Sequence, residues 1–171
     1  MAYRVYQTEG IVLAKKDFGE AERLFYIFTK EFGMIKAIAR GVRYIKSKLR
    51  SNLDLFSYGN ISLILAKENW QIVDVEEKEK NREIIINSKK LNLFARIAGF
   101  LTRMIKGEER NDFIWEEIKN LFLRLKKEDS DDLEIFFMAR LLNNLGYLPE
   151  IFSSRKLLIS AINKAVKESM L

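Results

Sequence analysis

Hydrophobic and polar residues alternate along the first part of the chain with the period of two that is typical of β-strands. Apolar, β-branched and aromatic residues fill Thr8–Leu13, Arg23–Thr29 and Met34–Gly41. Two further runs of this kind, Ile61–Leu65 and Gln71–Val75, follow after a longer connection. The pattern predicts five short strands within the first 79 residues.

The third run shows the alternation most clearly. Ile35, Ala37 and Ala39 fall on one face, and Lys36, Ile38 and Arg40 fall on the other. Small inward residues suit the tight interior of a closed barrel. Together with the long link between the third and fourth strands, they indicate an oligonucleotide-binding (OB) barrel. An SH3-like barrel has a similar pattern and stays open at this point. Gly10 indicates a bulge or tight curvature in the first strand.

From Asn81 onward the apolar residues recur at three- and four-residue steps, which is typical of helices. The expected helices carry apolar stripes that include Ala95, Phe122, Phe136 and Leu157 respectively. The fold class is therefore β + α, an OB-fold β-barrel followed by an all-helical domain. We expect the domains at residues 1–79 and 80–171, joined near residues 76–82.

Two absent residue types limit the chemistry. The chain has no Cys and no His, so it lacks thiolate nucleophiles, Cys-based zinc sites and the commonest general base. Its Gly-containing segments match no phosphate-binding loop motif. These absences favour a binding protein over an enzyme, without metal or cofactor.

The positive charge is concentrated in one segment. Of 30 Lys and Arg against 24 Asp and Glu, six lie between Glu31 and Asp54, where the chain has no acid. They are Lys36, Arg40, Arg43, Lys46, Lys48 and Arg50. The charge of these six residues equals the formal net charge of the whole chain, +6. Such a patch favours nucleic-acid phosphates, although charge runs in general are often only solvated surface.

Aromatic residues near this segment are candidates for stacking on bases. Alternation puts Phe25 on one strand face and Tyr26 with Phe28 on the other, so at least one pair belongs to the core. We expect the Phe side chains to be core and Tyr26 and Tyr44 to be accessible, because a Tyr hydroxyl prefers a wet edge. The position of Trp70 stays open.

Acidic clusters have ordinary explanations. The group from Glu128 to Glu134 lacks the spacing of an EF-hand loop and suits the first turn of a helix. Asp17, Glu20 and Glu22 flank an expected turn without a nucleophile. Neither a membrane-spanning run nor a signal peptide is recognisable, so we expect a cytoplasmic protein.

Several ordered motifs resemble the RecO recombination mediators. These are Thr8–Leu13, Phe18–Leu24 and Phe28–Gly33, then the basic stretch Ala39–Arg50 and the run Leu53–Gly59. In the helical half, Ala139–Pro149 is similar to the family's LLxxLGYxP segment.

The resemblance implies a DNA repair and recombination mediator. Such a protein binds single- and double-stranded DNA, anneals strands, contacts the tail of the single-strand-binding protein, and with RecR assists RecA loading. A nucleoid-associated location follows. By position, Gly41, Arg43, Lys46, Ser47 and Arg50 fall on the family's basic element.

Two departures from the family stand out. Many RecO proteins carry a four-Cys zinc module after the Leu-Gly-Tyr-x-Pro segment, whereas here Glu150–Ser154 leads into the last helix, so we expect no zinc. The chain is also shorter than is usual for the family. From the residues alone, an RNA-binding OB protein and an acidic-peptide-binding adaptor remain alternatives.

Overall fold

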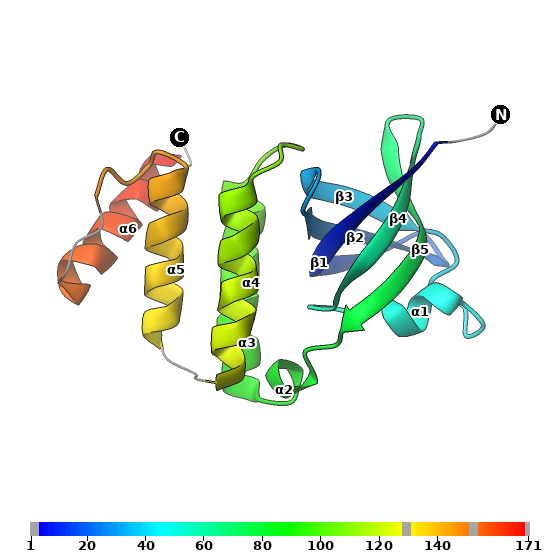
Figure 1. Ribbon diagram of the computed structural model, residues 1–171, viewed down its shortest axis with the longest axis horizontal. Helices are drawn as coiled ribbons and strands as arrows, with labels where there is room; N and C mark the ends of the chain where they lie inside the picture. Colours follow the sequence, from blue (N-terminus) through cyan, green and yellow to red (C-terminus); the bar gives the residue numbers. More distant parts are fainter. Residues whose placement is uncertain (1–3, 128–130, 151–153, 170–171) are drawn as a thin grey trace. The chain divides into compact units, whose positions relative to one another are not determined.

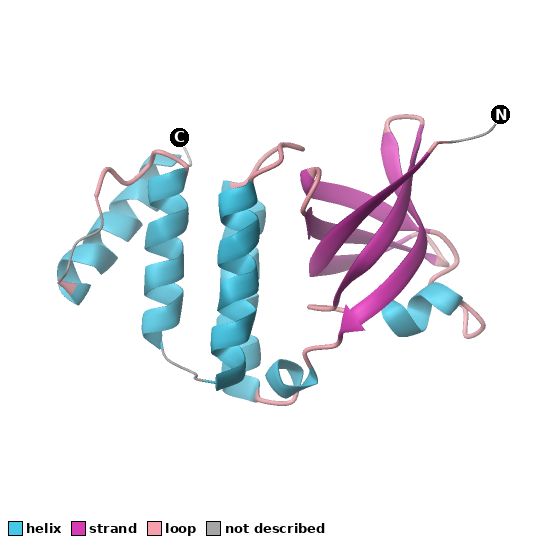
Figure 2. Ribbon diagram, viewed as in Figure 1, coloured by secondary structure: helices cyan, strands magenta, loops and turns pink. Residues whose placement is uncertain are grey.

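The computed structural model describes residues 4–127, 131–150 and 154–169. In this part of the chain, five strands precede most of the helical structure (Figures 1 and 2). The strands are β1 (Val5–Phe18), β2 (Glu22–Thr29), β3 (Gly33–Ala39), β4 (Tyr58–Ala66) and β5 (Asn69–Glu79). The helices are α1 (Lys48–Asn52), α2 (Arg82–Ile85), α3 (Ser88–Met104), α4 (Asp112–Lys127), α5 (Asp131–Asn144) and α6 (Arg155–Ser169).

The strands form a closed barrel in the order β1-β2-β3-β5-β4. All neighbouring pairs are antiparallel except β3 and β5, which run parallel where Ala37 lies opposite Trp70. This order, with a helix between β3 and β4, is the OB topology. The prediction of an OB barrel followed by helices is confirmed, and the SH3-like alternative is wrong.

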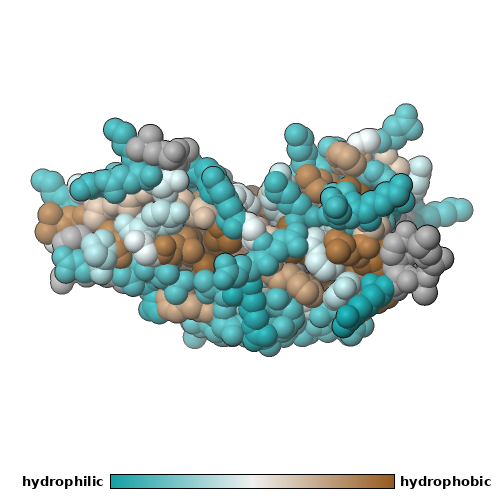
Figure 3. Space-filling model, turned by 90° about the horizontal axis from the view of Figure 1, so that it is seen from above, coloured by the Kyte–Doolittle hydropathy of each residue, from teal (hydrophilic) through white to brown (hydrophobic). Residues whose placement is uncertain are grey.

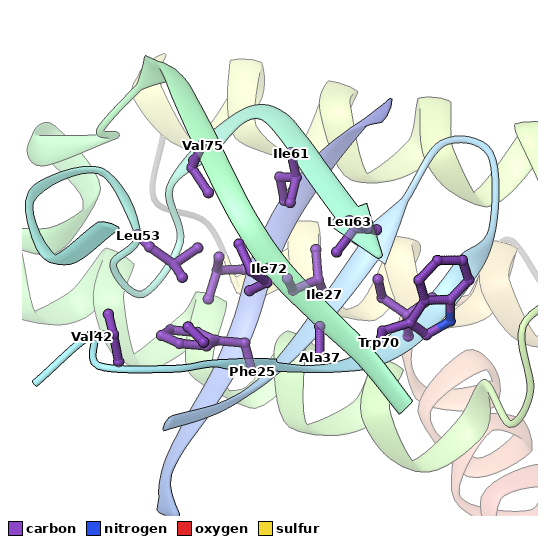
Figure 4. Close-up of a cluster of buried hydrophobic side chains, with 13 residues drawn as sticks. Phe25, Ile27, Ala37, Val42, Leu53, Ile61, Leu63, Trp70, Ile72 and Val75 are labelled. Atoms are coloured by element: carbon purple, nitrogen blue, oxygen red, sulfur yellow. The ribbon is translucent and has the colours of Figure 1, made fainter. Parts of the chain in front are cut away.

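Alternating side chains fill the barrel interior (Figure 4). Ile35, Ala37 and Ala39 are fully buried, as the alternation along the third strand predicts. Gly10 is needed where strands cross closely, because a Cβ there would lie 2.8 Å from the Cδ1 of Ile61. The bulge expected at Gly10 lies instead between Val12 and Ala14. The close contact with Ile61, not a bulge, thus explains this glycine.

The barrel includes chain from beyond its last strand. Residues 105–115 pack with residues 1–82 as one unit, while 83–104 and 116–171 make up the second. Within the first unit, the ring of Trp115 stacks on Phe28 with centroids 6.4 Å apart. Trp70 is a core residue whose indole N–H donates to Glu108 at 2.8 Å. The domain boundary near residue 79 stays a prediction.

The helices that follow the barrel in sequence show the expected periodicity, with local differences. In α4, Ile114 and Leu125 are buried as predicted, and Asn111 accepts a hydrogen bond from the backbone N–H of Ile114 at 3.0 Å. By contrast Ala95, Phe136 and Leu157 are exposed, although they belong to the apolar stripes. A stripe identifies the mean direction of the buried face, whereas the neighbours present at each turn decide which members are covered.

The sequence pattern does not predict the two short helices α1 and α2. Lys48–Asn52 lies in the basic connection between the third and fourth strands, where the pattern predicts no helix, and α2 has only four residues. Single helical turns carry too few residues to show a period of 3.6. In the described part of the chain, no helix combines the length and apolar character needed to cross a bilayer.

Candidate nucleic-acid interface

The outer face of β2 and β3 carries an aromatic ring beside a cation. Tyr26 lies opposite Lys36 across the two strands, and the Lys36 Nζ is 5.6 Å from the centre of the Tyr26 ring. Phe25 points into the core, and Phe28, on the same face as Tyr26, is covered by Trp115. Tyr26 is therefore the partly accessible member of these aromatics, in agreement with expectation.

Two of the six cations are paired with acids of the β1–β2 hairpin. The Arg40 Nε lies 3.6 Å from a carboxylate oxygen of Glu22, and the Arg43 Nη2 lies 3.8 Å from one of Asp17. Arg43 also donates from Nη1 to the backbone oxygen of Gly19 at 3.2 Å. These pairs orient both guanidinium groups and reduce the net charge of this part of the surface.

Asp17 remains ionised in this setting. Its carboxylate accepts a hydrogen bond from the Nε of Arg23 at 2.7 Å. That bond, together with the charges of Arg23, Arg43 and Lys15, lowers the pKa of Asp17 below its ordinary value, against a smaller opposing effect of desolvation. The acid that accompanies Arg43 is therefore negative at neutral pH.

The other four cations are exposed and make no ion pair with the residues that the structure describes. They are Lys36, Lys46, Lys48 and Arg50. Within the described ranges, their charge has no intramolecular acid to offset it. They are the strongest candidates for contact with phosphates.

The six cations follow the chain around the barrel rather than sharing one strand face. Lys36 lies on β3, Arg40, Arg43 and Lys46 lie on the β3–α1 loop (residues 40–47), and Lys48 and Arg50 lie on α1. Helix α1 is held against β5, where Asn52 donates from Nδ2 to the backbone oxygen of Val75 at 3.2 Å. The basic segment thus passes from a sheet face to one end of the barrel (Figure 1).

Gly41 and Ser47 shape this segment rather than adding charge. Gly41 has a φ of +64°, a left-handed conformation that favours glycine. A Cβ there would lie 3.3 Å from the Cδ2 of Tyr44, so the absence of a side chain makes room for that ring. Ser47 occupies the N-cap position of α1, without a side-chain hydrogen bond to the helix.

The first strand adds a cation that the sequence reasoning missed. β1 continues to Phe18, beyond the expected end at Leu13, and its Lys16 lies opposite Leu24 of β2. Leu24 in turn lies opposite Ile38 of β3, on the same outer face as Tyr26. Three consecutive charged residues follow Ala14, so no alternation of apolar and polar residues was available to predict that the strand continues.

Acidic side chains gather on a different part of the barrel. A pocket of about 390 Å³ on β1, β4 and β5 is lined by Glu9, Glu31, Asp74 and Glu76 among other polar residues. The hydroxyl of Tyr58 donates to Glu9, which lowers the pKa of Glu9; burial opposes this, and Lys78 and Lys30 assist it. The barrel surface therefore separates a cationic segment from an acidic pocket.

The acidic clusters considered from the sequence form no catalytic arrangement in the described residues. Asp17 and Glu22 are ion-pair partners of arginines. Residues 128–130 of the cluster from Glu128 to Glu134 lie outside the described residues, as do residues 151–153 of the connection to the last helix. No group of three or more His, Cys, Asp or Glu side chains in residues 4–127, 131–150 and 154–169 could hold a metal ion.

Comparison with known proteins supports the likeness seen in the motifs. Residues 1–76 match the family described as Recombination protein O N terminal. The chain is 32% identical over 147 residues to a DNA repair protein RecO of Thermodesulfovibrio yellowstonii, covering 85% of this chain and 59% of the relative. It is 29% identical over 152 residues to a DNA repair protein RecO of Acetivibrio thermocellus, which covers 88% of this chain and 61% of that relative.

The chain thus spans about three fifths of the length of these curated relatives. The family match falls on the OB barrel, and the pairwise matches extend through most of the helices. The N-terminal barrel thus matches the RecO N-terminal family, and most of the chain is similar to curated RecO proteins.

Proposed function

We propose that the chain is a non-enzymatic DNA repair and recombination mediator. It binds single- and double-stranded DNA through the basic segment, promotes annealing, and assists RecA loading on strands coated by the single-strand-binding protein. This places its action at the nucleoid. The observation that carries the proposal is the run of exposed cations from Lys36 to Arg50 on an OB barrel.

The mechanism we propose is charge neutralisation. Two complementary strands repel each other through their phosphates, and a shared cationic surface lowers that repulsion. The four cations without an ion pair within the described residues contribute most, because no acid competes with the phosphate for them; they are Lys36, Lys46, Lys48 and Arg50. Arg40 and Arg43 contribute less, since a phosphate must compete with Glu22 and Asp17.

The test is a triple variant, Lys46→Gln, Lys48→Gln and Arg50→Gln. These substitutions keep side-chain length while removing three charges. We expect single-strand affinity to fall at least about tenfold at low salt, for all base sequences alike, and annealing to slow. Unchanged annealing by a folded triple variant would contradict the site assignment.

The control removes the same charge elsewhere. Lys127, Lys156 and Lys167 are exposed on helices of the second unit, and changing all three to Gln alters the net charge equally. We expect this control to retain most of its affinity. An equal loss in both triple variants would show that net charge alone, and not the basic segment, governs binding.

The RNA-binding alternative shares the same electrostatics. Competition between DNA and RNA oligonucleotides of matched sequence separates the two functions. We expect DNA to compete at least as well as RNA, because phosphate contacts do not require a 2′-hydroxyl. A strong preference for RNA would favour the RNA-binding function.

A groove in the helical unit favours an additional partner, the acidic tail of the single-strand-binding protein. The groove, about 260 Å³, lies between α4 and α5 and exposes Leu123 and Phe136. Arg124 and Arg140 line it as well, and Arg140 forms an ion pair with Glu117 of the same groove at 2.8 Å, with which an acidic peptide would compete. Apolar side chains beside guanidinium groups suit a peptide that ends in acids and an apolar residue.

Titration with such a peptide, in the absence of nucleic acid, tests this partner. Changing Phe136 to Ser should abolish binding of the peptide while leaving DNA binding intact. Peptide binding that survives this change and disappears in the Lys46, Lys48, Arg50 variant would move the adaptor function to the barrel. Recruitment of RecR and RecA belongs to the same proposal and is measured by RecA loading on coated strands.

A further inference from the structure

The β3–α1 loop exposes two large apolar side chains in the middle of the basic segment. Tyr44 is 65% exposed and Ile45 is 90% exposed. A fully solvated isoleucine flanked by a tyrosine and by cations is unusual for a surface that serves only to bind phosphates. Charge neutralisation, as proposed above, makes no use of Ile45.

The loop is held in place beneath these side chains. Val42 is buried in the barrel core, and Leu49 packs partly against the same cluster. The backbone N–H of Tyr44 donates to the oxygen of Gly41, and that of Ser47 donates to the oxygen of Tyr44, both at 3.1 Å. Two successive turns therefore present Tyr44 and Ile45 to solvent on a fixed backbone.

A second anchor ties the loop to the β1–β2 turn. The backbone N–H of Arg43 donates to the oxygen of Ala21 at 3.2 Å, and its side chain donates to the oxygen of Gly19. An ordered loop loses less conformational entropy on binding than a mobile one. The exposure of Tyr44 and Ile45 is thus a built feature of the barrel.

The loop also forms a recess. Arg43, Tyr44, Ile45 and Lys46 line an open, mostly apolar pocket of about 560 Å³. A nucleobase offers two apolar faces and is attached to a phosphate. An aromatic ring, an aliphatic wedge and two flanking cations match those parts.

We propose that the β3–α1 loop captures unpaired nucleobases, with Tyr44 as the stacking surface and Ile45 as an apolar wedge beside it. This inference rests on the proposed DNA binding and names its preferred substrate: strands whose bases are unstacked, rather than intact duplex. Bases inside a duplex already stack on their neighbours, so their faces are not available to the loop.

The experiment compares three probes of equal length with the full chain by fluorescence anisotropy. The probes are a thymidine single strand, the same backbone with abasic sites, and a blunt duplex. We expect the wild type to bind the thymidine strand about five- to a hundredfold more tightly than the abasic strand, which is the range of base stacking. Because the abasic strand has phosphates but no bases, its affinity measures only the phosphate contacts of the proposed function.

Two variants then isolate the loop. Ile45→Ser and Tyr44→Ser should each reduce the preference for thymidine over abasic strand, and together they should abolish it, with duplex affinity unchanged. Both side chains are exposed, so neither change removes core packing. Leu157→Ser is the matched control, since Leu157 is an exposed aliphatic residue of α6, and it should change nothing.

The outcomes separate the two proposals. If the loop variants weaken thymidine, abasic and duplex probes equally, base capture is overturned while backbone binding stands. If the wild type fails to bind even the abasic strand at low salt, the proposed phosphate binding fails as well. Ile45-dependent binding to phosphatidylserine vesicles, without any preference for bases, would overturn base capture in favour of a membrane surface.

Discussion

Gly41 shows how one residue decides the shape of the basic segment. Its left-handed φ turns the chain out of β3, and its lack of a Cβ leaves room for the ring of Tyr44. Neither property adds a contact to DNA. The motif likeness pointed to this position, and the structure supplies the physical reason.

Changing Gly41 to Ala should therefore affect both stability and binding. We expect the free energy of unfolding to fall by about 1–2 kcal/mol, because a non-glycine residue is strained at positive φ. We also expect weaker single-strand binding, because the ring of Tyr44 must move. Urea unfolding and fluorescence anisotropy measure the two effects.

Gly146 offers the control, because its φ is also positive, at +80°, and a Cβ there would have no described atom within 4 Å. Gly146→Ala should lower stability similarly and leave DNA affinity unchanged. If Gly41→Ala binds DNA like the wild type, then the placement of the Tyr44 ring does not matter.

At the scale of elements, the β1–β2 hairpin sets the charge of the basic segment through its acids. Asp17 pairs with both Arg23 and Arg43, and Glu22 pairs with Arg40. The basic segment itself contains no acid. Its acidic partners come from β1 and β2, which precede it in sequence, so the sequence of the segment does not reveal them. Removing one of them should therefore strengthen phosphate binding.

Asp17→Asn should raise single-strand affinity about twofold at low salt, in the range expected for one surface charge. Glu116→Gln changes the net charge equally from an exposed site on α4 and should have a smaller effect. Fluorescence anisotropy with one single-stranded probe measures the affinity of both variants and of the wild type. An equal gain in both variants would mean that only net charge counts.

The same substitution has a predicted effect on acid stability. Because the pKa of Asp17 is lowered in the folded chain, its ion pairs stabilise the fold above about pH 4 and are lost as pH falls through the lowered pKa. Asp17→Asn should therefore show a smaller decrease in melting temperature between neutral and acidic pH. If the melting temperature of the variant falls as much as that of the wild type, the ion pairs of Asp17 do not stabilise the fold.

Trp115, near the start of α4, belongs to the barrel unit. It is buried, and its ring packs near Phe28 and Tyr58, with centroids 6.4 and 6.2 Å away. Trp115→Ala should lower the free energy of unfolding by about 3–5 kcal/mol, as expected for a buried aromatic residue. Phe113→Ala, at a more exposed neighbouring position, should cost clearly less in urea unfolding.

At the scale of the whole molecule, the strand pattern was enough to predict the OB barrel. Alternation at Ile35, Ala37 and Ala39 identified the inward face, and the long link after β3 indicated the topology. The packing of residues 105–115 with the barrel was not predictable. It includes contacts between residues far apart in sequence, such as Trp115 with Phe28 and Glu108 with Trp70, and the local pattern at one residue does not indicate its partner.

The candidate site was predictable in its cations and less so in its arrangement. The charge run named Lys46, Lys48 and Arg50, which the structure leaves without acidic partners in the described residues. Local sequence could not show that Asp17 approaches Arg43, or that Ile45 stands exposed. Polar and apolar surface are mixed over the face in Figure 3, so hydropathy alone does not single out an interface.

The salt dependence of single-strand DNA binding tests the central claim most directly. The logarithm of affinity, plotted against the logarithm of salt concentration, falls by about 0.7 per phosphate contact. The four cations without acidic partners in the described residues should give a slope of about −3, and all six should give about −4. A slope near zero would contradict phosphate binding by the basic segment.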